Sequence, residues 1–342
     1  MKKMTASLYL PIIIGCLSLS ISSCKKATTA DENVIRAVVA SNIIDPGELV
    51  GNFEEDSSNI YQWHGIVCKD PIHALGQQYV EGNAAAIGIP VREGLKSARF
   101  IVRPGDQAFD HTSGERCEAN HYNDTWNGYT QERNDDDFYY GWSTYIPTTW
   151  VTTTNATTGS WSILTQWHHR SRSSPPIHLS MVGNDLHLKI TSGLFNGAGE
   201  LQADAGKVTN YATNLDFNLF PSFAKGVWHD FIIHVRWTPN ATGNVQVYHK
   251  LQSQSTFAQV FTRYNVSTMQ LYRLADWNRA IDPIDNDAGT PDNAIPWGTG
   301  YVTAPLFYRL GLYRNPHSTI TNTLYHDNWA RATTYAAIAN NF

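Results

Sequence analysis

The sequence has no excess of basic residues. Its 25 Lys and Arg are outnumbered by 30 Asp and Glu, which gives a formal net charge of −5. A protein that binds nucleic acid is expected to present a basic surface, so this composition argues against a nucleic acid as partner. It stays compatible with an anionic sugar, because a local cluster of cations can lie in an acidic protein.

Long apolar runs are missing as well. The apolar run at residues 8–19 is shorter than the roughly 20 residues that a membrane-spanning helix needs. Two lysines precede it, and small residues and Cys24 follow it. This order is typical of a secretion signal. It resembles a bacterial lipobox, which implies cleavage before Cys24 and lipidation of its thiol; ordinary cleavage near Ser23 is the alternative.

We therefore expect residues 1–23 to be a lipoprotein signal peptide, residues 24–45 a tether and N-terminal lead-in, and residues 46–342 one folded domain. The mature protein is expected to be an exported bacterial lipoprotein. Its location would be the outer membrane or cell surface, with the periplasmic face as a further option. We expect a monomer, attached to the membrane through the lipid on Cys24.

Cysteine is scarce, with four residues in the chain. They form no C-x-x-C pair and no Cys/His cluster, which argues against a zinc site. Cys16 leaves with the signal and Cys24 carries the lipid, so Cys68 and Cys117 remain. Two cysteines in an exported protein predict one disulfide bond; two buried free thiols are the alternative.

The mature chain also lacks an internal repeat, a Pro/Ser-rich linker and a long amphipathic helix. Instead, apolar and polar residues alternate, which is typical of strands with one buried and one displayed face. The short alternating segments, separated by turns, are residues 99–103, 138–146, 160–168, 185–190, 228–237 and 244–249, with short helical pieces at 34–44 and 71–80. This pattern predicts a single all-β sandwich.

The segment LFYRLGLYR, residues 306–314, places Arg309, Gly311 and Tyr313 on one face of a strand. Leu310 and Leu312 then point into the core. Gly311 would leave an open patch between the arginine and the tyrosine, where a flat ring could bind. A glycine in a bulge is the alternative.

Two further segments display polar side chains that could join this strand. They are ILTQWH at residues 163–168 and RCEAN at residues 116–120. A glutamate two positions from an arginine lies on the same strand face and can hold the guanidinium in place. The residues displayed in this way are Leu164, Gln166, His168, Arg116, Glu118 and Asn120.

Four segments, taken in order, resemble the polysaccharide lyase family that includes heparin lyase I and glucuronan lyase. They are RFIVRPGD with GERCE (99–118), YYGWSTYIP with ILTQWH (139–168), GVWHDFIIHVRWTPNATG (226–243), and LFYRLGLYR with LYHDN (306–328). The resemblance implies a β-jelly roll, that is, a concanavalin A-like sandwich. It also implies cleavage of a uronic-acid polysaccharide by β-elimination, which leaves 4,5-unsaturated uronate ends.

The chemistry of elimination explains why such residue types would be needed. The carboxylate of the uronate must be neutralised so that the enolate that forms on loss of the C5 proton is stabilised. A base must remove that proton, and an acid must protonate the leaving O4. A tyrosine can serve when neighbouring cations favour its ionised form.

The resemblance implies roles for individual residues. Tyr313 matches the catalytic tyrosine of the G-x-Y segment and would be the acid; in an alternative assignment it would also be the base. His168 matches the histidine of Q-W-H, as base or carboxylate neutraliser, and Arg116 matches the arginine of R-x-E, which binds the carboxylate. Arg309 stands where heparin lyase I has a lysine, which keeps the charge but changes its geometry. Specificity for sulfated sugars is therefore left open.

Other residues are weaker candidates. Gln166 and Glu118 would assist in substrate binding, and His234 and Arg236 are candidate subsite residues on the displayed face of their strand. His169 and Arg170 would either add basic charge at the edge of the site or lie in a solvated loop. The remaining candidates are Trp277 and Trp297, for ring stacking or for the core, Tyr308, which is expected to point inward, and Asp327, which is expected to be structural.

No cofactor is required for this chemistry, and no metal ligands are assigned. The loop at residues 276–297 contains Asp282, Asp285, Asp287 and Asp292, whose oxygens suit calcium, but their spacing is not that of an EF-hand. Calcium binding is therefore left open. The expected partner is an anionic polysaccharide.

Two other functions fit parts of the pattern. A glycoside hydrolase on a similar sandwich would need two carboxylates, but the E-x-D-x-E strand of sandwich-fold glucanases is absent. A non-catalytic carbohydrate-binding lipoprotein could show the same aromatic face. The joint presence of Arg116, His168 and Tyr313 favours the lyase.

Overall fold

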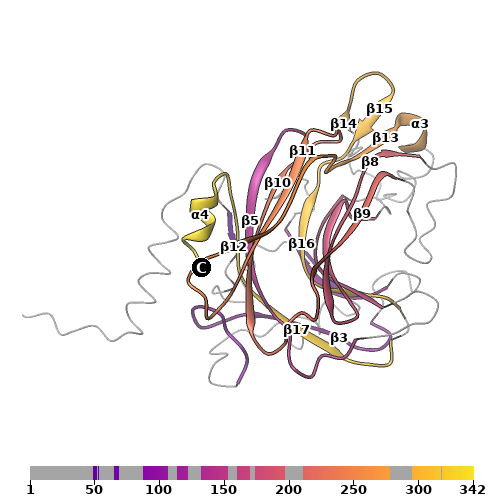
Figure 1. Ribbon diagram of the computed structural model, residues 1–342. Helices are drawn as coiled ribbons and strands as arrows, with labels where there is room; N and C mark the ends of the chain where they lie inside the picture. The colour runs from indigo at the N-terminus through magenta and orange to yellow at the C-terminus, as the bar shows by residue number, and fades with distance from the viewer. Residues whose placement is uncertain are drawn as a thin grey trace, which may run out of the picture.

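The computed structural model describes residues 49–51, 53, 65–68, 88–106, 114–121, 132–152, 160–169, 174–196, 211–277, 295–316 and 318–342. Within them the chain forms two curled β-sheets that pack face to face, with almost no helix (Figure 1). This is the β-jelly-roll sandwich that the sequence predicts. The predicted signal peptide, Cys24 and both predicted helical pieces lie outside the described residues.

One sheet has seven strands, in the order β1-β17-β5-β10-β11-β12, and β3 pairs with β17 as well. Its strands are β1 (Leu49–Gly51), β3 (Ala98–Val102), β5 (Asp137–Tyr145), β10 (Trp228–Arg236), β11 (Gly243–Leu251), β12 (Ala258–Val266) and β17 (Asn322–Ala332). The last strand of the chain therefore lies inside the sheet, between β5 and the first strands.

The other sheet has ten strands, in the order β14-β15-β13-β8-β7-β6-β16-β4-β2, with β9 also paired to β8. Its strands are β2 (Gly65–Cys68), β4 (Glu115–Asn120), β6 (Trp161–His168), β7 (Ile177–Val182), β8 (Asp185–Phe195), β9 (Tyr211–Phe220), β13 (Gln270–Arg273), β14 (Ile295–Pro296), β15 (Tyr301–Thr303) and β16 (Phe307–Arg314). The short helices are α3 (Leu274–Asp276) and α4 (Tyr335–Ala339).

Residues that alternate in the predicted strands point in turn to the core and to the outer face of their sheet. Phe231, Ile233 and Val235 of β10 pack in the same hydrophobic core as Leu310 and Leu312 of β16. Both sheets thus share one core. The face of the ten-stranded sheet that is directed away from this core is called the polar face below.

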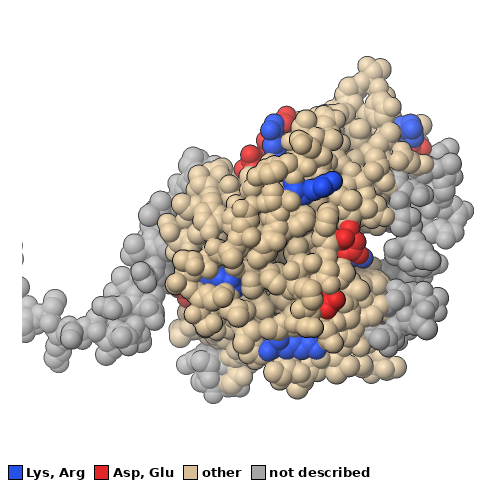
Figure 2. All heavy atoms as spheres, viewed as in Figure 1, with Lys and Arg blue, Asp and Glu red and all other residues tan. Residues whose placement is uncertain are grey.

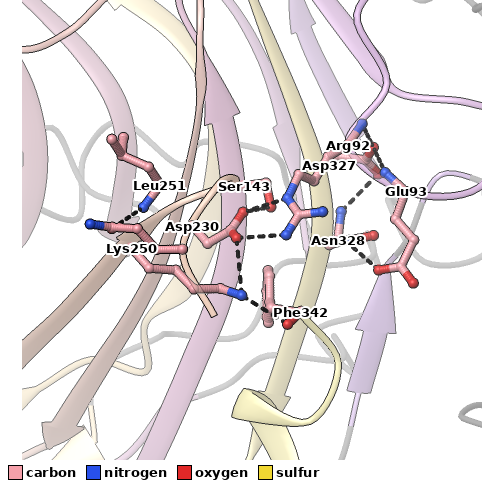
Figure 3. A network of polar contacts seen from close by, with 10 residues as sticks. Arg92, Glu93, Ser143, Asp230, Lys250, Leu251, Asp327, Asn328 and Phe342 are labelled. Atoms are coloured by element: carbon pink, nitrogen blue, oxygen red, sulfur yellow. Dashed lines mark hydrogen bonds and ion pairs between the residues drawn. The ribbon is translucent and has the colours of Figure 1, made fainter. Parts of the chain in front are cut away.

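The outer face of the seven-stranded sheet is covered in part by α4 and by a buried charge network (Figures 1 and 3). Asp230 is fully buried and accepts two hydrogen bonds from the guanidinium of Arg92, at 2.9 and 2.8 Å, and one from Ser143, at 2.7 Å. Lys250 lies 3.7 Å from the same carboxylate and donates to the carbonyl oxygen of Phe342. A buried carboxylate needs such partners because its desolvation is costly.

Figure 2 shows isolated blue and red groups on a mainly tan surface, so the described residues form no broad basic patch on the side in view. Among the described residues, no helix has the length and apolar character needed to cross a membrane.

Candidate active site

The candidate residues lie on three adjacent strands of the ten-stranded sheet. In register, Tyr313 of β16 is opposite Arg116 of β4, and Arg309 is opposite Gln166 of β6. His168 is opposite Phe307, two positions along β16 from Arg309. Leu310 and Leu312 are fully buried in the core, so the alternating residues of β16 face the opposite way. The sequence prediction that these residues share one face is therefore confirmed by the strand register.

Glu118 is the central anion of the site. Its side chain is 1% exposed, and one carboxylate oxygen accepts a hydrogen bond from the amide of Gln166. The other oxygen lies 3.9 Å from a guanidinium nitrogen of Arg116 and 3.9 Å from one of Arg309. Two cations thus share one carboxylate, which leaves net positive charge for an anionic ligand.

Planar side-chain groups pack closely against the ring of Tyr313. The guanidinium carbon of Arg116 is 3.9 Å from the centroid of its ring, and the ring of Trp161 meets it edge-on at 5.1 Å. A side chain at Gly114 would come within 2.5 Å of the tyrosine ring. The glycine is therefore required for the ring to lie where it does, beside a fixed positive charge.

His168 carries a neutral imidazole ring in this environment. Its Nδ1 contacts the carbonyl oxygen of His169, and a carbonyl can only accept, so Nδ1 carries the hydrogen. Burial lowers the pKa of His168 well below its usual value, and the charges of Arg309 and Arg116 lower it further. In the neutral ring the other nitrogen, Nε2, is then left as an acceptor.

His169 does not have either of the roles considered from the sequence. It is 1% exposed, and its Nε2 lies 2.7 Å from Gln270 Oε1 and 2.9 Å from the hydroxyl of Tyr272. Burial lowers the pKa of His169 to about 4. It is therefore an uncharged core residue that anchors the end of β6 to β13, and Arg170 lies outside the described residues.

Gly311 and Leu164 are placed differently from the prediction. Gly311 has φ +146°, and a side chain there would meet the carbonyl oxygen of Cys117 at 2.4 Å. The glycine permits close strand contact at a bulge and does not leave an open patch on the polar face. A second irregularity, between Ile163 and Thr165, turns Leu164 into the core while Gln166 keeps its place.

The structure does not bring His234 and Arg236 to the site. Both belong to β10 of the seven-stranded sheet, whose alternate residues fill the core, so they lie on the opposite outer face of the sandwich. His234 contacts Gln246 and Asp137 and stacks on Tyr139, while Arg236 lies 3.6 Å from Asp135. Their prediction as subsite residues of this site was wrong, because alternation alone does not say which sheet a strand joins.

Several other predictions have clear outcomes. Trp277 is 2% exposed in a small cluster near β13, so it is a core tryptophan, whereas Trp297 is partly exposed. Tyr308 points inward as expected. Asp327 is buried and accepts hydrogen bonds from the backbone of Arg92, Glu93 and Asn328, which confirms its structural role (Figure 3).

The cysteine and metal predictions stay untested. Cys68 and Cys117 are direct partners in the β2–β4 register, but the disulfide bond itself remains a prediction. No group of three or more potential metal ligands occurs in the part of the chain that the structure describes. The four aspartates considered for calcium lie outside that part.

Three polar residues of the same face were given no role from the sequence, where Asn120 alone was placed on a displayed strand face. Asn120 is fully buried opposite Arg309, and neither polar atom of its side chain has a hydrogen-bond partner in the part of the chain that the structure describes. His178 and Ser180 lie on β7, next to β6, and each has a buried atom that no described residue pairs with. The alternation in IHLSMV, residues 177–182, was the signal that could have revealed β7.

The arrangement suits proton transfer next to a bound anion. Two arginines and an amide can bind a carboxylate, and a tyrosine hydroxyl and a neutral imidazole can each exchange a proton. A pair of carboxylates placed for glycoside hydrolysis does not occur among the candidate residues, since Glu118 is already held by Gln166 and two arginines.

A family model described as polysaccharide lyase matches residues 55–330. Among solved structures, the chain is similar to an endo-β-1,4-glucuronan lyase from the fungus Trichoderma reesei, with 15% identity over 72% of this chain and 84% of that chain and a TM-score of 0.47. It is also similar to an alginate lyase from Aplysia kurodai, with 10% identity, 80% and 99% coverage and a TM-score of 0.40. A third is alginate lyase vAL-1 from Chlorella virus, with 9% identity, 81% and 96% coverage and a TM-score of 0.40. No functionally curated protein matches the sequence.

Proposed function

Because the chain belongs to the polysaccharide lyase family, and so is a carbon–oxygen lyase that acts on polysaccharides, we propose that its substrate is a uronic-acid polysaccharide cleaved by β-elimination. The observation that carries this proposal is the cation cluster beside Tyr313. Arg116 lies over the tyrosine ring and shares Glu118 with Arg309. A carboxylate that binds these arginines brings its own sugar ring next to the phenol.

In this mechanism Arg116, Arg309 and Gln166 bind the uronate carboxylate and stabilise the negative charge that spreads onto it when the C5 proton leaves. The electron pair of the C5–H bond forms the C4=C5 double bond, and the C4–O4 bond breaks. Tyr313 gives its proton to the leaving O4. The products are a free hydroxyl on one fragment and a 4,5-unsaturated uronate on the other.

We assign both proton transfers to Tyr313, with its phenolate as the base, and a binding role to His168. The register supports this division, because six positions of β16 separate Tyr313 from Phe307, the partner of His168. An extended strand covers roughly 20 Å over that length, although curling of the sheet shortens the gap between side chains. His168 Nε2, as a neutral acceptor, suits a sugar hydroxyl.

The test is ultraviolet absorbance from the conjugated C4=C5 bond during incubation with a panel of uronate polymers, with and without calcium. Tyr313→Phe removes the hydroxyl but keeps the ring, and Tyr264→Phe, on the exposed surface of β12, is the matched control. We expect absorbance to rise on at least one polymer, to be lost in Tyr313→Phe and to be kept in Tyr264→Phe. Chain shortening without absorbance would mean hydrolysis and would contradict the proposal.

His168→Asn separates the two proton-transfer assignments. With His168 in a binding role, KM rises more than kcat falls. A loss of kcat as large as that of Tyr313→Phe would make His168 the base instead. The lipid anchor at Cys24, the export and the membrane location remain proposals from the sequence, and mass spectrometry of the mature N-terminus would test them.

A further inference from the structure

The polar face continues past the candidate active site onto three more strands. Residues paired across neighbouring strands form two rows that cross the sheet at right angles to the strands. One row consists of Arg116, Tyr313, Ile163, Ser180, His187 and Asn218, and the other of Asn120, Arg309, Gln166, His178, Lys189 and Asp216. A chain that binds at Tyr313 and Arg309 and crosses the strands in this direction next meets β7.

Two side chains of β7 point toward this face. Ile177, Leu179 and Met181 pack in the core, so His178 and Ser180 face the other way. Ser180 is 1% exposed and His178 is 9% exposed. Among the described residues, the hydroxyl oxygen of Ser180 and the Nδ1 atom of His178 have no hydrogen-bond partner.

Such atoms are unusual in a folded protein. A buried polar group without a partner destabilises the folded state, and most buried groups are therefore paired. Two of them on adjacent positions of one face, beside Gln166, are explained when a ligand supplies the partners. A hydroxyl and an imidazole nitrogen are suited to sugar hydroxyl groups.

The charge around β7 differs from that around Tyr313. Lys189, next in the row after His178, lies 3.1 Å from Asp216, and His187 lies 2.6 Å from the same aspartate. The cation is thus already neutralised by the protein. Burial and Lys189 also lower the pKa of His178 to about 3, so this ring is uncharged at neutral pH.

We propose that His178 and Ser180 form a second sugar subsite, which binds the unit next to the uronate at Tyr313. This subsite recognises the hydroxyl groups of that unit and not its charge. This inference rests on the proposed function, because the first subsite places the chain. It adds to that function a preference for particular sugar units at each of the two subsites. A carboxylate is required at the arginine subsite, whereas a neutral sugar is accepted at the β7 subsite.

The test combines kinetics with stability. Ser180→Ala removes a hydroxyl that has no partner, so the melting temperature should stay the same while KM rises about fivefold to tenfold, the size of one lost neutral hydrogen bond. His178→Phe keeps a ring but removes both nitrogens and should raise KM similarly. The matched control is Ser192→Ala, whose buried hydroxyl is bonded to Ser267; it should lower the melting temperature and leave KM unchanged.

Oligosaccharide length gives a second readout. In the Tyr313→Phe background, Ser180→Ala should weaken binding of a tetrasaccharide but not of a monouronate. Unchanged KM in both β7 variants of an active enzyme, or a melting temperature that falls as in Ser192→Ala, would overturn the subsite alone. Wild-type protein that neither cleaves nor binds any uronate polymer would overturn the proposed function, and the subsite with it.

Discussion

The guanidinium of Arg116 lies over the ring of Tyr313, with 3.9 Å between the guanidinium carbon and the ring centroid. Both residues come from neighbouring strands at the same register position. The contact therefore follows from strand pairing and does not depend on a loop. It places a permanent positive charge beside a hydroxyl that can transfer a proton.

Arg116→Lys tests the geometry of that charge. Lysine keeps the charge but cannot lie flat over the ring or bind a carboxylate with two parallel hydrogen bonds. We expect kcat/KM to fall about 100-fold or more, with little change in melting temperature. Arg236→Lys, on the outer face of the other sheet, is the control and should behave as wild type. Equal effects of the two variants would contradict the site.

Glu118→Gln tests the carboxylate that two arginines share. The amide keeps the shape but leaves Arg116 and Arg309 facing each other without an anion. We expect the free energy of unfolding to fall by about 1–3 kcal/mol, measured by urea denaturation. Glu93→Gln, which changes a surface contact to Asn328, should change it by less than about 0.5 kcal/mol. A stabilised Glu118→Gln protein would mean that the three side chains are not coupled.

Gly311→Ala tests the close contact between β16 and β4. The added carbon would meet the carbonyl oxygen of Cys117 at 2.4 Å and the Cα atom of Glu118 at 2.7 Å. Gly183→Ala has a positive φ as well, but meets nothing within 4 Å. We expect Gly183→Ala to cost about 1 kcal/mol, from backbone strain, and Gly311→Ala to cost clearly more. Similar melting temperatures for the two variants would show that β4 can move away.

Stability is expected to fall as the pH drops below about 6.5. Burial lowers the pKa of His326 and His178 to about 3, and that of His169, His229 and His249 to about 4. The unfolded chain binds these protons near pH 6.5. Below that pH the unfolded state holds more protons than the folded state, so the free energy of unfolding decreases with falling pH until the folded pKa values are reached.

Urea denaturation at pH 7.5, 6, 5 and 4 measures this dependence. Each buried histidine contributes a slope of at most about 1.4 kcal/mol per pH unit. His326→Gln removes one of these groups and should lower the slope by up to that amount. A midpoint that stays constant between pH 7.5 and 5 would show that these histidines are not buried in their neutral form.

The cysteine pair gives a chemical test of the strand register. Cys68 and Cys117 face each other across β2 and β4. A thiol count on the folded domain, residues 46–342, unfolded without reductant, should find no free thiol if the predicted disulfide is present. The Cys117→Ser variant should then show one. Two reactive thiols in the wild type would support the alternative of unpaired cysteines.

Local patterns in the sequence were enough to predict the sandwich and most of the site. Alternation in LFYRLGLYR and ILTQWH gave the correct face for Arg309, Tyr313, Gln166 and His168, because these strands are long and lie next to each other. The core side of β10 was equally clear from Phe231, Ile233 and Val235.

Long-range pairing and bulges could not be read in the same way. His234 alternates as well as His168 does, yet its strand joins the other sheet. The bulge beside Leu164 shifts the period by one residue, and no single residue type marks that position. His169 looks like a loop residue from its neighbours, and only its partners on β13, more than 100 positions later, show that it is buried.

The late strands have a consequence for how the protein is made. β16 lies between β6 and β4, and β17 lies between β5 and the strands β1 and β3. Until residues 307–332 have left the ribosome, each sheet is divided in two and has unpaired edges. Contacts between such distant segments also form slowly. A nascent chain that ends before residue 307 therefore lacks Tyr313 and cannot close the sandwich. The site and the closed sandwich form in the same final step of folding.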